Sequence, residues 1–344
     1  MIDRRYAVLA VIIAACATLA ACDSLGEYKP ADISQYSRVI YKYTAFGASD
    51  AVGVGASVMC DPAGLVANPA CPGGTGYVPD IANILGAAPN QMTLNDLGIS
   101  GAVVGPDVKG LLLSCPAFAA SLGGNALHDF DSDELPLYPV GENLVTIFAG
   151  GNDVRDLFIA NGVLGCGINT ATYFNAFAFD LQTLVQTAHA LNPFAHIYIA
   201  DLPNFGLIPL GVCIGANPAS PPAFCGANNP PQGLPIAQAG LGIISELFDL
   251  EIFQVFAANL PMADLLCNAQ SYVPTNFTPD GFHPDDAGYA ALAASYVNII
   301  KAVPPPAPSF TCAQATFFPP DVHAKIDWAA MRSVRLSEGL KPRR

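Results

Sequence analysis

The stretch Asn143-Leu-Val-Thr-Ile-Phe-Ala149 is a continuous apolar run, and the turn Gly150-Gly151-Asn152-Asp153 follows it at once. Runs of this kind are typical of strands that are buried on both faces of a parallel sheet. We therefore predict a buried strand over 143–149 that ends in a tight polar turn. Because ligands of such sheets bind at the carboxyl ends of the strands, this turn is a candidate functional segment.

The same order, a strand-like run and then a helical pattern, recurs along the chain. The sequence predicts further strands over 39–46, 92–99, 196–200 and 262–266, and helices over 170–191, 234–260 and 287–302. Strands that alternate with helices indicate a parallel sheet that is covered on both faces. We therefore expect an α/β fold with a parallel sheet of about five strands.

Three long inserts rich in Gly, Pro, Ala and Cys separate these elements, at 53–90, 105–140 and 206–233. We expect them to form long loops of low charge. The proline-rich insert 206–233 can either roof a pocket or pack away from any site, and the sequence favours neither interpretation.

Ser49 lies in the turn Gly47-Ala48-Ser49-Asp50, directly after the first predicted strand. Its small neighbours leave the hydroxyl group open to a substrate, and a nearby imidazole would make it a nucleophile. A serine at such a position is also a common helix N-cap. Both roles are compatible, because a helix start points N–H groups at an anion. We take Ser49 as the candidate nucleophile.

His283 is the one histidine of five with a carboxylate three residues earlier, in Asp280-Gly281-Phe282-His283. This spacing lets Asp280 accept a hydrogen bond from Nδ1–H and leaves Nε2 free to face a serine. A helix-capping aspartate followed by a surface histidine is the alternative. We expect His283 to act as a general base that Asp280 orients.

Gly101, in Ile99-Ser100-Gly101-Ala102, follows the second predicted strand, as Asn152 follows the third. The N–H groups of Ser49 and Gly101 and the carboxamide of Asn152 are candidate donors to an oxyanion. Gly101 and Asn152 can equally be ordinary turn residues that tolerate left-handed backbone. The isolated carboxylates of Asp50 and Asp153 are too few for a metal site, so we expect no metal and no other cofactor.

These turns resemble the four blocks of the SGNH (GDSL-type) hydrolases, which are esterases and lipases. The residues that carry the resemblance are Ser49, Gly101, Asn152 and His283. The segment Ala200–Gly206 also resembles a strand-to-loop segment of that family. The resemblance implies a flavodoxin-like three-layer α/β/α sandwich, a triad of Ser49, His283 and Asp280, and an oxyanion hole made by Ser49, Gly101 and Asn152.

One position departs from the family pattern. The first block usually reads Gly-Asp-Ser, and here Ala48 replaces that aspartate. The change leaves the triad intact but removes a local anchor of the nucleophile turn. The chain contains no Gly-x-Ser-x-Gly motif, which argues against an α/β-hydrolase nucleophile elbow.

Residues 1–21 have the pattern of a signal peptide, with Arg4-Arg5 before an apolar run over 6–19. The run is shorter than the ~20 residues of a membrane span. Its end, Leu19-Ala20-Ala21-Cys22, resembles a bacterial lipobox, which implies an acylated Cys22. We therefore expect an exported, membrane-anchored lipoprotein that faces the periplasm or the cell exterior. An ordinary secretory signal is the alternative.

The sequence predicts four segments. The segments are a signal peptide over 1–21, a tether over 22–37, a hydrolase domain over 38–302 and a peripheral C-terminal tail over 303–344.

With 52% hydrophobic and 12% charged residues, the domain should have one large apolar core. The net charge of −14 excludes nucleic acid as an expected partner and disfavours electrostatic docking on anionic lipid.

Ten cysteines are present, and eight remain once Cys16 and Cys22 are set aside. An even number in an exported chain predicts disulfides. The short separations favour Cys60–Cys71 and Cys213–Cys225 and leave the pairing of Cys115, Cys166, Cys267 and Cys312 open. The absence of a Cys-x-x-Cys motif, and of a His close to a Cys, argues against zinc.

From these residues we expect a serine esterase or lipase that hydrolyses a small-molecule or lipid ester through an acyl-enzyme on Ser49. A glycan O-acetyl esterase or O-acetyltransferase with the same catalytic groups is one alternative. The other is a non-catalytic surface lipoprotein that binds lipid or glycan.

Overall fold

The computed structural model describes residues 39–60, 73–256, 260–308, 311–315, 326–337 and 340–341. The predicted signal peptide over 1–21, the tether over 22–37 and the lipid-attachment residue Cys22 lie outside the described residues.

Five parallel strands form one sheet in the order β2-β1-β3-β4-β5. The strands are β1 (Ile40–Gly47), β2 (Gln91–Asp96), β3 (Leu144–Phe148), β4 (His196–Ala200) and β5 (Met262–Ala263). The α/β fold and the five-stranded parallel sheet expected from the sequence are therefore confirmed. Gly47 pairs with Phe148 and Ala45 with Asp96, so the turns that follow β1, β2 and β3 lie at one edge.

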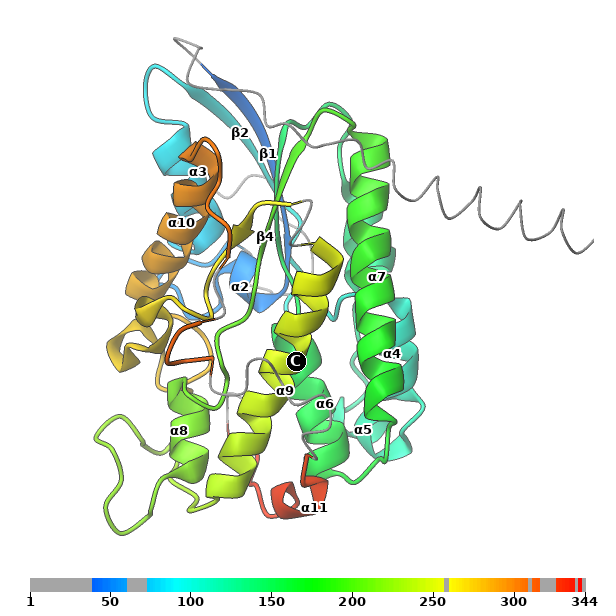
Figure 1. Ribbon diagram of the computed structural model, residues 1–344, viewed down its shortest axis with the longest axis vertical. Helices are drawn as coiled ribbons and strands as arrows, with labels where there is room; N and C mark the ends of the chain where they lie inside the picture. The colour runs from blue at the N-terminus through cyan, green and yellow to red at the C-terminus, as the bar shows by residue number, and fades with distance from the viewer. Residues whose placement is uncertain are drawn as a thin grey trace, which may run out of the picture.

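Two layers of helices enclose the sheet (Figure 1). The described helices are α2 (Ser49–Val52), α3 (Tyr77–Leu85), α4 (Pro106–Leu113), α5 (Pro116–Ser121), α6 (Gly151–Leu157), α7 (Thr170–Leu191), α8 (Pro209–Gly215), α9 (Pro235–Phe256), α10 (Asp286–Lys301) and α11 (Trp328–Met331). Helices α3 and α10 cover one face, and α4, α6, α7 and α9 cover the other. This is the expected three-layer α/β/α sandwich.

Large aromatic side chains fill the space on both faces of the sheet. On one face, Tyr77 of α3 and Tyr296 of α10 are fully buried, with their rings stacked at 5.7 Å between centroids. On the other, Phe177 of α7 meets Phe248 of α9 edge to face at 4.6 Å. Burial of these aromatic rings stabilises the packing of helices on both faces of the sheet.

The inserts contain helices, which differs from the expected loops. Helix α3 lies in the first insert, α4 and α5 in the second and α8 in the third. Three of these helices begin at a proline, namely Pro106, Pro116 and Pro209. A proline at the first helical position lacks only an N–H that would have no intrahelical partner, so it starts a helix as readily as it ends one.

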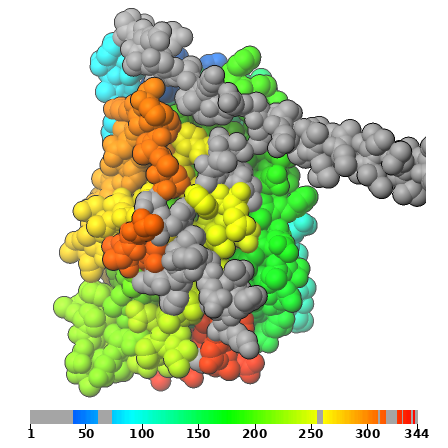
Figure 2. All heavy atoms as spheres, viewed as in Figure 1, coloured from blue at the N-terminus to red at the C-terminus, as the bar shows by residue number. Residues whose placement is uncertain are grey.

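The C-terminal segment is also more than the peripheral tail that we expected. Met331 of α11 is fully buried, and its side chain occupies the space beside Gly162 and Gly240. Leu340 is fully buried as well. Helix α11, red in Figures 1 and 2, lies at the same end of the molecule as α6 and the start of α9. The described parts of 303–344 therefore complete the core.

Three disulfides join described residues: Cys115–Cys166, Cys213–Cys225 and Cys267–Cys312. The second is the local pair expected from the sequence, and the other two link cysteines whose pairing the sequence left open. Cys60 is disulfide-bonded, but its predicted partner Cys71 lies outside the described residues. Disulfides are typical of exported proteins. None of the helices in the described ranges combines the length and apolar character that a membrane crossing requires.

Candidate active site

Ser49 is the first residue of α2, immediately beyond the carboxyl end of β1. Because β3 pairs with β1 in parallel, the turn after β3, which contains Asn152 at the start of α6, lies next to Ser49 at the same edge of the sheet. The side chains of Ser49 and Asn152 are almost fully buried, with 2% and 3% exposure. The sheet therefore brings together two residues that are about a hundred positions apart in the chain.

Ser49, His283 and Asp280 form a continuous chain of hydrogen-bonding groups. The Oγ atom of Ser49 lies 3.1 Å from Nε2 of His283, and Nδ1 of the same ring lies 2.8 Å from Oδ2 of Asp280. His283 is 1% exposed and Asp280 is 7% exposed. These distances are those of hydrogen bonds, so a proton can pass from the serine to the imidazole without a rearrangement.

The carboxylate of Asp280 is held by further donors. Its Oδ1 accepts hydrogen bonds from Oγ1 of Thr278 (2.7 Å) and from the backbone N–H groups of Phe282 (2.9 Å) and His283 (3.0 Å). Burial raises the pKa of Asp280, but the hydrogen bonds and charge of His283 outweigh burial and hold this pKa well below its ordinary value. Asp280 is therefore ionised at neutral pH and stabilises a positive charge on the imidazole.

The loop that carries His283 is fixed by a close backbone approach at Gly281. This glycine has a φ of +72° and its carbonyl accepts the N–H of Leu210 at 2.9 Å. A Cβ atom at Gly281 would lie only 2.8 Å from the backbone nitrogen of Leu210 and closer still to the amide nitrogen of Asn229. The glycine is thus required both by the backbone angle and by the lack of space.

The candidate oxyanion donors come from the turns after β1, β2 and β3. The N–H of Ser49 belongs to the first turn of α2, where N–H groups have no intrahelical partner. Gly101 has a φ of +84°, and no atom lies within 4 Å of where its Cβ would be. The amide nitrogen of Asn152 donates to the carbonyl of Ala102 at 2.8 Å. Since an amide carries two N–H groups, the other remains for a substrate oxygen.

Two side chains that the sequence analysis did not single out for these roles also hold these loops. Thr278 donates to Asp280, as described above, and Oδ1 of Asp153 accepts the N–H of Val104 at 3.1 Å. Burial raises the pKa of Asp153 to about 8, although the Val104 N–H lowers it. Asp153 therefore ties α6 to the Gly101 loop. Its position directly after Asn152 was the only signal in the sequence.

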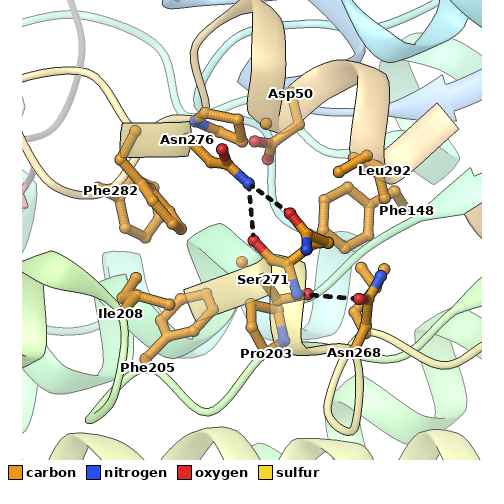
Figure 3. A pocket seen from close by; sticks show the side chains of 17 residues that line it. Asp50, Phe148, Pro203, Phe205, Ile208, Asn268, Ser271, Asn276, Phe282 and Leu292 are labelled. Atoms are coloured by element: carbon orange, nitrogen blue, oxygen red, sulfur yellow. Dashed lines mark hydrogen bonds between the residues drawn. The ribbon is translucent and has the colours of Figure 1, made fainter. Parts of the chain in front are cut away.

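An apolar pocket lies beside these residues (Figure 3). It reaches Asp50 and Gly151, which adjoin Ser49 and Asn152, as well as Phe282 and Pro284 on either side of His283. Phe205 and Ile208 line one side of it, and Phe148 and Leu292 lie across from them. The pocket therefore adjoins the triad through the sequence neighbours of Ser49, Asn152 and His283, although these three residues do not line it themselves.

The insert 206–233 contributes to this pocket only at its beginning. Ile208 lines the pocket, and Leu210 holds the backbone of the His283 loop. The amide nitrogen of Asn229 donates to the carbonyl of Pro209 at 3.0 Å and so fixes α8. Residues 217–224 are largely exposed. The insert thus acts as one wall of the pocket and a support for the His283 loop.

In the described part of the chain, no three His, Cys, Asp or Glu side chains are grouped so that they could hold a metal ion.

Several solved ester hydrolases are similar to this chain. The extracellular lipase of Streptomyces rimosus is 16% identical, with a TM-score of 0.44 over 75% of this chain and 98% of that one. Phospholipase A1 of Streptomyces albidoflavus is 16% identical, with a TM-score of 0.42 over 76% and 99%. An acetylxylan esterase of Geobacillus stearothermophilus is 18% identical, with a TM-score of 0.42 over 75% and 92%. No curated protein matches the chain.

The sequence pattern of the GDSL-like lipase and acylhydrolase family matches residues 45–291. The matched range begins in β1, ends in α10 and contains the four turns described above. It covers well over half of the chain. This protein therefore belongs to the GDSL-like lipase/acylhydrolase family.

Proposed function

We propose that this protein hydrolyses carboxylic esters through an acyl-enzyme formed on Ser49. The observation that supports the proposal most directly is the hydrogen-bonded chain from Ser49 through His283 to Asp280, with separations of 3.1 and 2.8 Å. A serine hydroxyl becomes a nucleophile when a positioned base accepts its proton. Here the base is already in contact with the hydroxyl, and an ionised carboxylate is in contact with the base.

In the first half of the reaction, Oγ of Ser49 attacks the carbonyl carbon of the ester. Nε2 of His283 takes the hydroxyl proton, and Asp280 stabilises the imidazolium that forms. The negative charge that develops on the carbonyl oxygen is stabilised by the N–H groups of Ser49 and Gly101 and by the amide of Asn152. His283 then gives its proton to the leaving alcohol, and the acyl group remains on Ser49.

In the second half, a water molecule replaces the alcohol. His283 takes a proton from the water as its oxygen attacks the acyl carbon, and the same three donors stabilise the second oxyanion. Collapse of this intermediate breaks the bond to Oγ of Ser49, which recovers its proton from His283. The carboxylic acid leaves and the resting state returns.

The apolar pocket favours esters with an apolar acyl or aryl group over acetylated sugars. Its walls include the rings of Phe148, Phe205 and Phe282. Burial of apolar surface against such walls contributes about 25 cal/mol per Å². Polar side chains also line the pocket, namely Asp50, Asn268, Gln270, Ser271 and Asn276, so glycan O-acetyl esters are the second choice of substrate.

The proposal is tested by the Ser49→Ala variant. We expect it to lose turnover of a 4-nitrophenyl ester and covalent labelling by a fluorophosphonate. The matched control is Ser114→Ala, because Ser114 is exposed and its hydroxyl only donates to the carbonyl of Leu111. Normal turnover in the Ser49→Ala variant would disprove the proposed mechanism. A wild-type protein that the fluorophosphonate does not label would support the non-catalytic alternative.

A panel of substrates separates the remaining alternatives. Esters of graded acyl length and acetylated sugars should be assayed side by side on the same preparation. We expect the highest kcat/KM for an apolar acyl group longer than acetyl. A preference for acetylated sugars would favour the glycan esterase, and acetyl transfer to an added sugar acceptor would favour the transferase.

We also propose that the protein is exported and anchored through acyl chains on Cys22. The three disulfides between described residues support export. The net charge of −14 disfavours attachment to an anionic membrane surface by charge alone, so that an anchor of this protein would have to be apolar.

A further inference from the structure

The carboxyl group of Glu134 lies between the turn of the candidate nucleophile and the turn of a candidate oxyanion donor. Its Oε2 accepts the N–H of Gly47 at 3.2 Å, and its Oε1 accepts the N–H of Ile99 at 3.2 Å. Gly47 precedes Ser49 by two residues, and Ile99 precedes Gly101 by two residues. One fully buried side chain therefore bridges both turns.

Glu134 reaches these turns from the insert 105–140, at the end of the helical segment Phe130–Glu134. The insert is paired with the Gly101 loop through two backbone hydrogen bonds. The N–H of Val103 donates to the carbonyl of His128 at 3.0 Å, and the N–H of Phe130 donates to the carbonyl of Val103 at 3.1 Å. The position of the carboxyl group is therefore set by the same loop that carries Gly101.

A buried carboxyl group at this point is costly, which argues that it has a task. Burial raises the pKa of Glu134 well above its ordinary value, although the two N–H groups lower it. Each oxygen keeps a lone pair for one N–H in either ionisation state. Ala48 has no polar side chain to hold the nucleophile turn, whereas the carboxyl group of Glu134 accepts the N–H of the neighbouring Gly47.

We propose that Glu134 is a positioning residue that holds the Ser49 turn and the Gly101 turn in register for ester hydrolysis. This inference rests on the function proposed above. The hydroxyl of Ser49 must reach the carbonyl carbon while the N–H groups of Ser49 and Gly101 face the carbonyl oxygen. The N–H of Ile99 also donates to the carbonyl of Gly47 at 3.2 Å, so Glu134 reinforces a direct backbone contact between the two turns. A shift of one turn against the other loses the alignment, and a misplacement of about 1 Å costs about 10²-fold in rate.

The Glu134→Gln variant tests the proposal with almost no change in shape. The amide oxygen of the new side chain accepts one of the two N–H groups, but the NH2 group cannot accept the other. We expect kcat for a 4-nitrophenyl ester to fall about 10- to 100-fold, with KM changed by less than about threefold. The rate of fluorophosphonate labelling of Ser49 should fall by a similar factor.

Glu142→Gln is the matched control. Glu142 also bridges β1 and β2, since its Oε2 accepts from the hydroxyl of Thr44 (3.1 Å) and its Oε1 from the amide of Asn95 (3.3 Å). Glu142 is 6% exposed, and its partners lie farther from the carboxyl ends of the strands than the partners of Glu134 do. We expect Glu142→Gln to keep kcat within about twofold of wild type, because Thr44 and Asn95 lie within the strands and not in the catalytic turns.

The proposal is overturned if folded Glu134→Gln keeps kcat within about twofold of wild type, or if Glu142→Gln lowers kcat as much. Should Glu134→Gln fail to fold, Glu134→Asp is assayed by the same criteria, because its shorter side chain cannot span both turns. The Ser49→Ala variant separates the two hypotheses. Activity that survives Ser49→Ala refutes the proposed function, whereas activity that survives only the Glu134 substitution refutes this inference alone.

Discussion

Asp280 shows how much of the site depends on the chemistry of one residue. Its Oδ2 contacts the ring of His283, and its Oδ1 accepts three hydrogen bonds from its own loop. The carboxylate therefore sets the orientation of the imidazole and stabilises its positive charge. An amide of the same shape could hold the loop in place, but it could not both orient the imidazole and stabilise its positive charge.

We expect Asp280→Asn to lower kcat by about 10⁴-fold with the fold retained. The amide oxygen of the new side chain would still accept hydrogen bonds from the backbone N–H groups of Phe282 and His283. The NH2 group would then face Nδ1 of His283 and donate a hydrogen bond to it. The imidazole must then carry its proton on Nε2, where it can no longer accept the proton of Ser49. Steady-state kinetics on a 4-nitrophenyl ester measure the loss. Thr278→Val, which removes one donor to Oδ1, should be far less impaired, and an equal loss in both variants would contradict the argument.

The same residue predicts a dependence of stability on pH. The pKa of Asp280 is lowered by folding, so the ionised carboxylate stabilises the folded state at pH values above its ordinary pKa. This contribution is lost as the pH falls through the lower pKa of the folded state. The difference in free energy of unfolding between wild type and Asp280→Asn should therefore be largest at pH 7 and shrink below about pH 4. Urea unfolding at pH 7 and pH 3 measures it, and a difference that grows at pH 3 would refute the assignment.

At the scale of elements, the loop between β5 and α10 is held by its contact with α8 as well as by its own turn. Replacing Gly281 with Ala forces a side chain into a left-handed backbone and against the nitrogen of Leu210. Gly167→Ala is the matched control, because Gly167 has a φ of +70° and no atom within 4 Å of a Cβ. We expect Gly167→Ala to cost about 1–2 kcal/mol and Gly281→Ala to cost clearly more, by about 1–3 kcal/mol. Urea unfolding compares them. Equal losses would show that space at Gly281 is not limiting.

The strands were predictable from the sequence to within a few residues because buried parallel strands are continuous apolar runs. The prediction over 143–149 corresponds to β3, and the prediction over 196–200 matches β4. The helices of the inserts were not recognised, since Pro106, Pro116 and Pro209 resemble breaks in a chain and act here as helix starts. The helical period is also too short to read in helices of six to eight residues.

The candidate site was predictable where its residues lie at the ends of elements. Ser49, Gly101 and Asn152 follow predicted strands, and the carboxyl ends of parallel strands meet at one edge. Glu134 could not be found in this way, because it lies inside an insert and contacts Gly47 across 87 positions. The same holds for the disulfide between Cys115 and Cys166, which are 51 positions apart. Contacts of this range depend on the folded sheet and leave no local signal.

For the whole molecule, the direction of β1 relates the proposed anchor to the site. The described chain begins next to Ile40, at the amino end of β1, and Ser49 lies beyond its carboxyl end. A strand of eight residues is about 26 Å long. An anchor at Cys22 would therefore join the domain at the edge of the sheet opposite to Ser49.

This arrangement requires that Cys22 is acylated, which substitution of single cysteines can test. We expect wild-type protein and Cys16→Ser to incorporate an alkynyl analogue of palmitate during growth, and Cys22→Ser to incorporate none. Cys16 is the matched control because it lies in the same apolar segment, six positions before Cys22. All three proteins should have the same kcat on a soluble ester, since neither cysteine belongs to the domain that carries Ser49. Label that persists in Cys22→Ser, or is absent from wild type, would refute the anchor and favour a secreted enzyme.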